Sequence, residues 1–164
     1  VPHVDVRGRI PFCGDLEHPL NLLHRRARRV RAPEAHRHRT LGKPLGQYTH
    51  VTRVRPGELL FVAGMLSADA DGNIVGVGDF DAQCAQVFRN VAAALESAGA
   101  GWGNVVQFTT YLVHSQSIPR FMEFRLREFP RMFANGIYPP NTLLVVDRLV
   151  QEPFLVEVQT IAAV

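Results

Sequence analysis

The fold is decided by the C-terminal stretch of the chain, YPPNTLLVVDRLVQEPFLVEVQTIAAV (residues 138–164). Val, Ile, Leu and Thr dominate both halves of this stretch, and such residues favour β-strands. Gln151-Glu152-Pro153 is typical of a turn between them. The sequence therefore predicts that the chain ends in two strands, residues 138–149 and 154–164.

The last of these strands carries a single carboxylate, Glu157. Side chains alternate between the two faces of a strand, which puts Glu157 on the same face as Leu155, Gln159 and Ile161. The opposite face is apolar apart from Thr160. Because burying an unpaired carboxylate is costly, Glu157 is either solvated on an open face or held there for a function.

Composition limits the class of protein. A chain of 164 residues fits one domain, and 46% apolar residues allow it a real core. No apolar run approaches the ~20 residues of a membrane span, and the N-terminus shows no signal-peptide pattern. The two cysteines, Cys13 and Cys84, provide neither a disulfide framework nor a cysteine-only metal site. We expect a protein of the reducing cytoplasm.

The charge is divided unevenly. Residues 1–45 hold ten Lys/Arg and four Asp/Glu, whereas residues 46–164 hold eight and eleven. We therefore divide the chain into a basic N-terminal extension, 1–45, and a domain, 46–164. The mildly acidic domain argues against a nucleic-acid groove on its own surface.

The extension has few local signals. A short edge strand at Val4–Ile10 and a basic helix at Leu20–Val30 fit its pattern. The arginines between Arg25 and Arg39 could bind phosphates, or the segment could be a solvated arm that packs on a neighbour. His36 and His38 could contact a metal, but no further Cys/His cluster completes a site.

The domain alternates strands and helices. We predict strands at 47–54, 59–66 and 104–114. A first helix runs from an Asp79 cap to Ala98, and a second is capped by Ser117 and ended or kinked by Pro130. The second helix would present Phe121, Phe124, Leu126 and Phe129. With the C-terminal strands this gives an α+β sandwich, one sheet with two helices on one face. The uncovered face favours self-association.

Three local features have structural interpretations. Gly64, inside an apolar strand, indicates a bulge or the close approach of another group. Asp69–Asn73 resembles the start of a calcium loop without its final glutamate, so a turn is expected. Cys84 falls on the apolar side of the first helix and is interpreted as packing.

Several motifs together resemble the Rid (YjgF, reactive intermediate deaminase) family. The resemblance covers residues 45–164 and rests on Gly46-Gln47-Tyr48-Thr49-His50-Val51, Leu60-Phe61-Val62-Ala63-Gly64, Gly78-Asp79-Phe80-Asp81-Ala82-Gln83, Asn90–Gly99, Thr110-Tyr111-Leu112 and Val156-Glu157-Val158. It implies a chorismate-mutase-like fold and a homotrimer whose sheets form a central β-barrel. It further implies clefts between subunits that bind small carboxylates. Active members hydrolyse enamines and imines to keto acids and ammonia without metal or cofactor.

Carried over by position, the resemblance assigns a candidate site. Glu157 is the candidate catalytic residue, and the candidate substrate-binding residues are Tyr48, Ala63, Gly64, Met65, Met122 and Asn141. Tyr48, Gly64 and Glu157 match the family pattern. Asn141 stands where the family has a carboxylate-binding arginine, Ala63 replaces a serine, Met65 a glutamine and Met122 an asparagine. Arg148 and Arg120 are candidates to replace the lost charge.

Three functions fit these observations. The chain could be a hydrolase in which Glu157 activates water, a non-catalytic trimer that binds a metabolite, or an RNA-binding protein acting through its basic extension. Small-molecule binding in a homotrimer is common to the first two.

Overall fold

The computed structural model describes residues 33–36, 38–55 and 57–164. Its elements follow in the order β1 (Glu34–His36), β2 (Val51–Arg53), β3 (Leu59–Met65), α1 (Phe80–Ser97), η1 (Trp102–Asn104), β4 (Val105–Leu112), α2 (Ser117–Met132), β5 (Asn141–Val145) and β6 (Val156–Ala163). None of its helices is long and apolar enough to cross a membrane.

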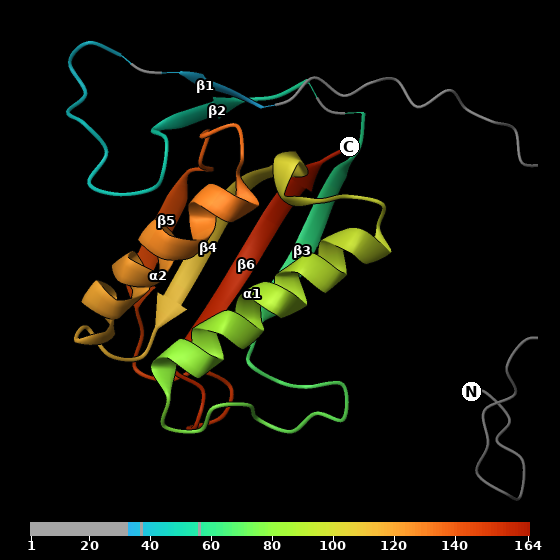
Figure 1. Cartoon of the computed structure of the whole chain (residues 1–164), viewed down its shortest axis with the longest axis vertical. Helices are drawn as coiled ribbons and strands as arrows, with labels where there is room; N and C mark the ends of the chain where they lie inside the picture. The colour runs from blue at the N-terminus through green and yellow to red at the C-terminus, as the bar shows by residue number, and fades with distance from the viewer. Residues whose placement is uncertain (1–32, 37, 56) are drawn as a thin grey trace, which may run out of the picture.

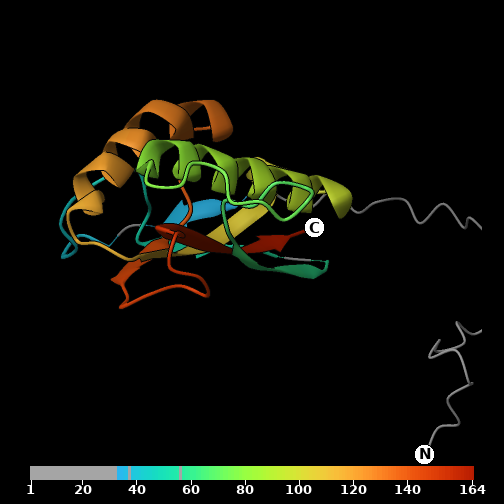
Figure 2. The same ribbon diagram turned by 90° about the horizontal axis from the view of Figure 1, so that it is seen from below.

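The domain has two layers, a sheet and a pair of helices on one face of it (Figure 1 and Figure 2). The sheet has the order β3-β6-β4-β5. Strand β6 pairs antiparallel with both β3 and β4, whereas β4 and β5 run parallel. The central position of β6 confirms that the C-terminal strand organises the sheet. The predicted α+β sandwich with two helices on one face is confirmed.

Helix α1 begins and ends where its sequence signals predict. The Asp79 carboxylate accepts hydrogen bonds from the backbone N–H groups of Asp81 and Ala82. These groups have no partner inside the helix, so the cap stabilises its first turn. Ala98 closes the helix, and Gly99 follows with φ of +71°, a conformation that favours glycine.

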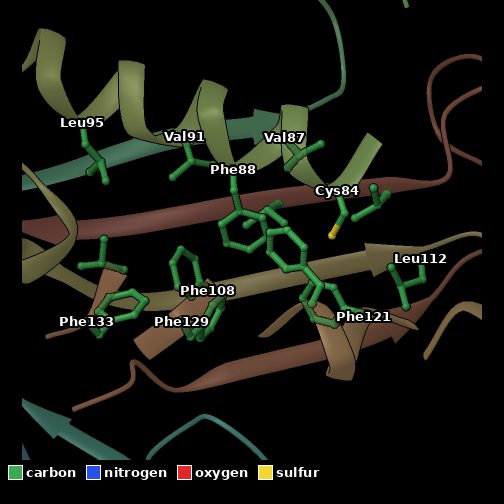
Figure 3. Close-up of a cluster of buried hydrophobic side chains, with 14 of the residues drawn as sticks. Cys84, Val87, Phe88, Val91, Leu95, Phe108, Leu112, Phe121, Phe129 and Phe133 are labelled. Atoms are coloured by element: carbon green, nitrogen blue, oxygen red, sulfur yellow. The ribbon is translucent and has the colours of Figure 1, made fainter. Parts of the chain in front are cut away.

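The core lies between the helices and the sheet and is rich in phenylalanine. Phe88 of α1 lies at its centre, with ring centroids 5.0 Å from Phe124 and 5.6 Å from Phe129 of α2 (Figure 3). Cys84 is fully buried in the same cluster, and burial raises the pKa of its thiol well above the usual value. The interpretation of Cys84 as packing is confirmed.

Two amide side chains of α1 attach the helix to distant loops. Gln83 Nε2 donates to the carbonyl oxygens of Gly76 and Pro153, and Gln83 Oε1 accepts from the N–H of Leu155. Asn90 Nδ2 donates to the carbonyl oxygens of residues 66 and 68, just after β3. Both amides belong to motifs of the resemblance. The printed bonds of Gln83 are all with backbone groups, whereas Asn90 Oδ1 also accepts from Gln86 Nε2.

The segment predicted as a strand at 47–54 is shorter in the structure. Only Val51–Arg53 forms a strand, and its partner is β1 rather than β3. The backbone before it bonds elsewhere: the Arg125 guanidinium donates to the carbonyl oxygen of Gln47, and Thr49 N donates to the carbonyl oxygen of Tyr138. These bonds hold residues 47–49 against α2 and the segment that precedes β5.

Details of α2 and β5 also differ from the prediction. Ser117 is the first residue of α2 and not its cap, Pro130 lies inside the last turn, and Leu126 is exposed on the outer face. Strand β5 covers only five residues of the predicted 138–149. Val146 N still donates to the carbonyl oxygen of Leu112, and the chain then forms the loop that leads to β6.

The predicted turn at Asp69–Asn73 is confirmed, since Asp69 Oδ1 accepts from the backbone N–H groups of Asp71 and Asn73. The predicted strand at Val4–Ile10, the basic helix at Leu20–Val30 and the arginines Arg25–Arg31 lie outside the described residues. The division at residue 45 stays a prediction, although β1, which pairs with β2, belongs to the segment before it.

Candidate functional site

A β-bulge in β3 brings Gly64 against Glu157. The pairing of β3 with β6 shifts register between Val62 and Met65, so two residues of β3 face one of β6. A Cβ built on Gly64 would lie 2.6 Å from the carboxyl carbon of Glu157, a distance at which one of them must move. Only glycine leaves room for the Glu157 side chain in its present position. The structure therefore has both features that Gly64 was predicted to indicate, a bulge and the close approach of another group.

Glu157 lines a pocket on the face of the sheet that the helices leave uncovered. The pocket has a volume of about 370 Å³ and is lined by Gly64, Tyr111, Val146, Arg148, Leu149, Val150, Glu157 and Gln159. Tyr111 of β4 is the register partner of Glu157. Strand alternation therefore places a phenol, a carboxylate and an amide side by side over the sheet.

The Glu157 carboxylate has neither a hydrogen bond nor an ion pair among the described residues. Partial burial raises its pKa above the usual value, because the ionised form is less well solvated than in water. A half-buried carboxylate without a partner can act as a general base that accepts a proton from water or from a ligand.

The other predicted site residues divide between two regions. Ala63 is exposed beside Gly64, whereas Met65 packs against the core. Tyr48 and Met122 lie with the segment before β2: the backbone N–H of Leu45 donates to the Tyr48 hydroxyl, and a Cβ on Gly46 would contact the Met122 methyl.

Asn141 lies on the opposite side of the sheet from Glu157. Its register partner in β4 is Phe108, a buried core residue, and its Oδ1 accepts from Thr110 Oγ1 at 3.0 Å. Glu157 pairs with Tyr111, whose side chain faces the uncovered side. One copy of the chain therefore does not bring Asn141 and Glu157 into a common pocket.

Arg125 of α2 was missed by the sequence analysis. It is 2% exposed, has no carboxylate partner among the described residues, and lies 4.8 Å from the Phe129 ring centroid. Burial lowers the pKa of its guanidinium to about 10. Its donation to Gln47 holds the segment that carries Tyr48. From the sequence alone, Arg125 would be interpreted as a solvent-exposed helix residue. Its burial depends on tertiary packing that the sequence does not reveal.

The two arginines considered as replacements for Asn141 have different surroundings. Arg120 forms ion pairs with Asp79 and Asp81 at the start of α1. Arg148 lines the Glu157 pocket. Within the described part of the chain no group of three or more His, Cys, Asp or Glu side chains could hold a metal.

The fold is thus a small α+β sandwich with a pocket that contains a carboxylate on its uncovered face. The family described as Endoribonuclease L-PSP matches residues 39–164, and the chain belongs to this family, in which the Rid and RutC proteins are its relatives. The predicted family is thus confirmed.

Individual relatives agree with this assignment. A RutC family protein of Pyrococcus abyssi is 31% identical over 120 residues, which cover 73% of this chain and 88% of the relative. The solved structure of the Rid-family protein YyfB from Yersinia pestis, itself of unknown function, aligns with a TM-score of 0.72 and 25% identity over 81% of this chain and 99% of its own. TdcF of E. coli shares the fold, with a TM-score of 0.59, 20% identity, and coverage of 73% of this chain and 93% of its own.

Proposed function

We propose that the chain forms a homotrimer that binds a small metabolite in clefts between subunits, and that Glu157 catalyses hydrolysis of an enamine or imine there. The observation that carries the proposal is the unpartnered, half-buried Glu157 carboxylate in a pocket of about 370 Å³. The pocket is of the size that small ligands occupy.

The proposed reaction needs one group that moves a proton. Ionised Glu157 accepts a proton from water as the water oxygen bonds to the carbon of the C=N⁺ group, giving a carbinolamine. Glu157 then returns the proton to nitrogen, and it accepts the hydroxyl proton as the C–N bond breaks, so that ammonia leaves and the carbonyl forms. An enamine first takes a proton on carbon to give the same imine. A carboxyl with a raised pKa suits both transfers at neutral pH.

Two observations favour a site shared between copies. The candidate residues lie on both sides of one sheet, so a second copy is needed to join the Tyr48 and Asn141 region to Glu157. The uncovered face also exposes large apolar side chains, including Leu59, Phe61 and Leu144. Such a face is normally buried in an assembly.

The test is release of keto acid and ammonia from imines that an amino-acid oxidase generates in situ. Acidic, aromatic and aliphatic amino acids would be supplied to the wild type, Glu157→Gln and Asn141→Arg. We expect Glu157→Gln to lower the rate at least about 100-fold, the usual contribution of a general acid–base group. Glu96→Gln, an exposed carboxylate on α1, is the matched control and should keep the wild-type rate.

Each outcome assigns a function. An undiminished rate in Glu157→Gln rejects Glu157 as the catalytic residue. A wild type that binds keto acids without turnover is a non-catalytic binder, and a gain of turnover in Asn141→Arg then shows that position 141 limits the chemistry.

RNA binding is the second candidate, favoured by the excess of six positive charges in residues 1–45. Replacing Arg25, Arg26, Arg28 and Arg29 by Gln should weaken RNA binding and flatten its salt dependence. Unchanged binding by that variant would reject the extension as the RNA-binding element.

A further inference from the structure

The sheet side of the Glu157 pocket is built from two neighbouring strands. Tyr111 of β4 is the register partner of Glu157 in β6, and both side chains line the pocket. The β-carbons of directly opposite residues lie about 4.5–5.5 Å apart, so the two side chains leave the sheet next to each other. A phenol hydroxyl and a carboxylate therefore belong to one pocket.

The Glu157 carboxylate leans away from Tyr111. A Cβ on Gly64 would lie 2.6 Å from the carboxyl carbon, so the carboxylate lies over Gly64 of β3. The strand order β3-β6-β4-β5 puts β3 and β4 on opposite sides of β6. The carboxylate thus stands toward one side of β6 and the phenol toward the other, and no hydrogen bond among the described residues joins them.

Tyr111 is half-buried, and its hydroxyl has no partner. It has neither a hydrogen bond nor an aromatic contact in the described part of the chain. Polar groups at this depth normally have a partner, and a water molecule often bridges two groups that are too far apart to bond directly. The two groups are complementary, because a phenol hydroxyl donates and a carboxylate accepts.

The other two tyrosines of the chain have different surroundings. The Tyr48 hydroxyl accepts from the backbone N–H of Leu45, and the Tyr138 ring packs against two phenylalanines of the core. Neither lines the Glu157 pocket. Tyr111 is thus the tyrosine whose hydroxyl is available to a molecule in this pocket.

The loop after β5 contributes mainly apolar side chains to the pocket. Val146, Leu149 and Val150 neither donate nor accept hydrogen bonds, and Arg148 of the same loop donates to Glu152. A water molecule or a ligand hydroxyl in the pocket therefore finds its partners on the side of the sheet.

We propose that Tyr111 and Glu157 hold one oxygen atom between them, and that in the hydrolysis this atom is the attacking water. Tyr111 donates to one lone pair of the water oxygen and keeps its own proton. One O–H of the water donates to Glu157, and the second lone pair forms the bond to the carbon of the C=N⁺ group. As this bond forms, the O–H proton passes to Glu157 and the π electrons of C=N⁺ move to nitrogen.

The attacking oxygen then becomes the hydroxyl of the carbinolamine and stays within reach of both groups. Tyr111 is in this way a residue that positions the water, and Glu157 is the residue that takes its proton. This inference rests on the proposed function, because it takes the Glu157 pocket as the ligand site.

The test uses the hydroxyl of lactate as a substitute for the carbinolamine oxygen. Lactate has a hydroxyl on the carbon next to its carboxylate and propionate has none, so calorimetric titration of the full-length protein with both reports how well the hydroxyl is bound. We expect the wild type to bind lactate at least about tenfold more tightly, and Tyr111→Phe to lose about fivefold of this preference with one hydrogen bond. Tyr138→Phe is the matched control: it removes the hydroxyl of a half-buried tyrosine outside the pocket and should keep the full preference.

Kinetics with the same variants distinguish the positioning of water from support of the fold. In imine hydrolysis Tyr111→Phe should lower kcat about tenfold and leave KM unchanged, because the water is not part of the bound substrate. Added to Glu157→Gln, Tyr111→Phe should have no further effect, since both residues act on one water molecule. A purely structural role would lower the free energy of unfolding instead and would add to the effect of Glu157→Gln.

The outcomes separate this inference from the proposed hydrolysis. A wild type that binds lactate and propionate equally, or Tyr111→Phe with the wild-type preference, overturns the assignment of Tyr111. A preference that depends on Tyr111 in a protein without imine turnover supports the shared oxygen site and rejects the hydrolysis. Turnover that depends on Glu157 but keeps the wild-type kcat in Tyr111→Phe supports the hydrolysis and rejects the positioning of water by Tyr111.

Discussion

The Glu157 carboxylate lies in the space that a side chain on Gly64 would need. A Cβ on Gly64 would be 2.6 Å from the carboxyl carbon and 3.0 Å from Cγ of Glu157. The bulge in β3 and the Glu157 carboxylate of β6 are therefore one structural unit, since the backbone shift at Gly64 makes room for the side chain that lines the pocket.

Replacing Gly64 by Ala should displace Glu157 rather than unfold the protein. The end of the glutamate side chain is flexible, and an off-rotamer position costs about 0.5–1.5 kcal/mol. We expect a loss of about 1 kcal/mol in the free energy of unfolding, together with loss of most Glu157-dependent imine hydrolysis. Gly101→Ala is the control, because its backbone is extended and a Cβ there meets nothing within 4 Å. Full activity in Gly64→Ala would show that the position of Glu157 is not critical.

The raised pKa of Glu157 predicts that the difference in stability between the wild type and Glu157→Gln changes with pH. The carboxyl ionises at higher pH in the folded protein than in the unfolded chain, because its surroundings desolvate the charge. The wild type therefore loses stability relative to the variant as the pH rises through the folded-state pKa. Thermal unfolding should show the largest advantage for Glu157→Gln near about pH 7 and a smaller one near about pH 4. Glu96→Gln serves as the control, and a constant difference across this range would contradict the prediction.

Much of the fold was predictable because its signals are local. The Asp79 cap, the glycine after Ala98 and the alternation around Glu157 each depend on neighbouring residues, and the structure has all three. The family was also predictable from local signals. Its motifs are short runs of sequence that cap a helix, form a turn or bond a helix to a loop.

The errors concern backbone whose partners are distant in sequence. Residues 47–50 alternate like a strand, but Arg125 and Tyr138 take up the backbone bonds of Gln47 and Thr49. The surroundings of Arg148 could not be predicted from the sequence either. They depend on the path of the β5–β6 loop, in which Leu149 is buried and Arg148 lines the Glu157 pocket.

The buried amide of Gln83 should contribute strongly to stability. It is fully buried and bonds to the backbone of residues 76, 153 and 155. Gln83→Leu would leave the Pro153 carbonyl and the Leu155 N–H without this partner, whereas the Gly76 carbonyl still accepts from Asp79 N. Each unsatisfied buried group costs about 1–3 kcal/mol, so we expect a loss of at least about 2 kcal/mol in urea unfolding. Gln151→Leu, in the exposed β5–β6 loop, should change little, and equal effects of the two substitutions would reject this role for Gln83.

Phe61 should hold the proposed trimer together. It is 74% exposed on the uncovered side of β3, and a fully buried phenylalanine contributes about 1.5–3 kcal/mol per copy. We expect the wild type to sediment as a trimer and Phe61→Glu as a monomer, because assembly would bury three unpaired carboxylates. Leu126→Glu is the matched control: Leu126 is 64% exposed, but it lies on α2 in the helix layer, so the substitution should leave the trimer intact. A wild type that sediments as a monomer would contradict the assembly and, with it, a cleft shared between subunits. A trimer that Phe61→Glu leaves unchanged would instead place the interface on another surface, away from β3.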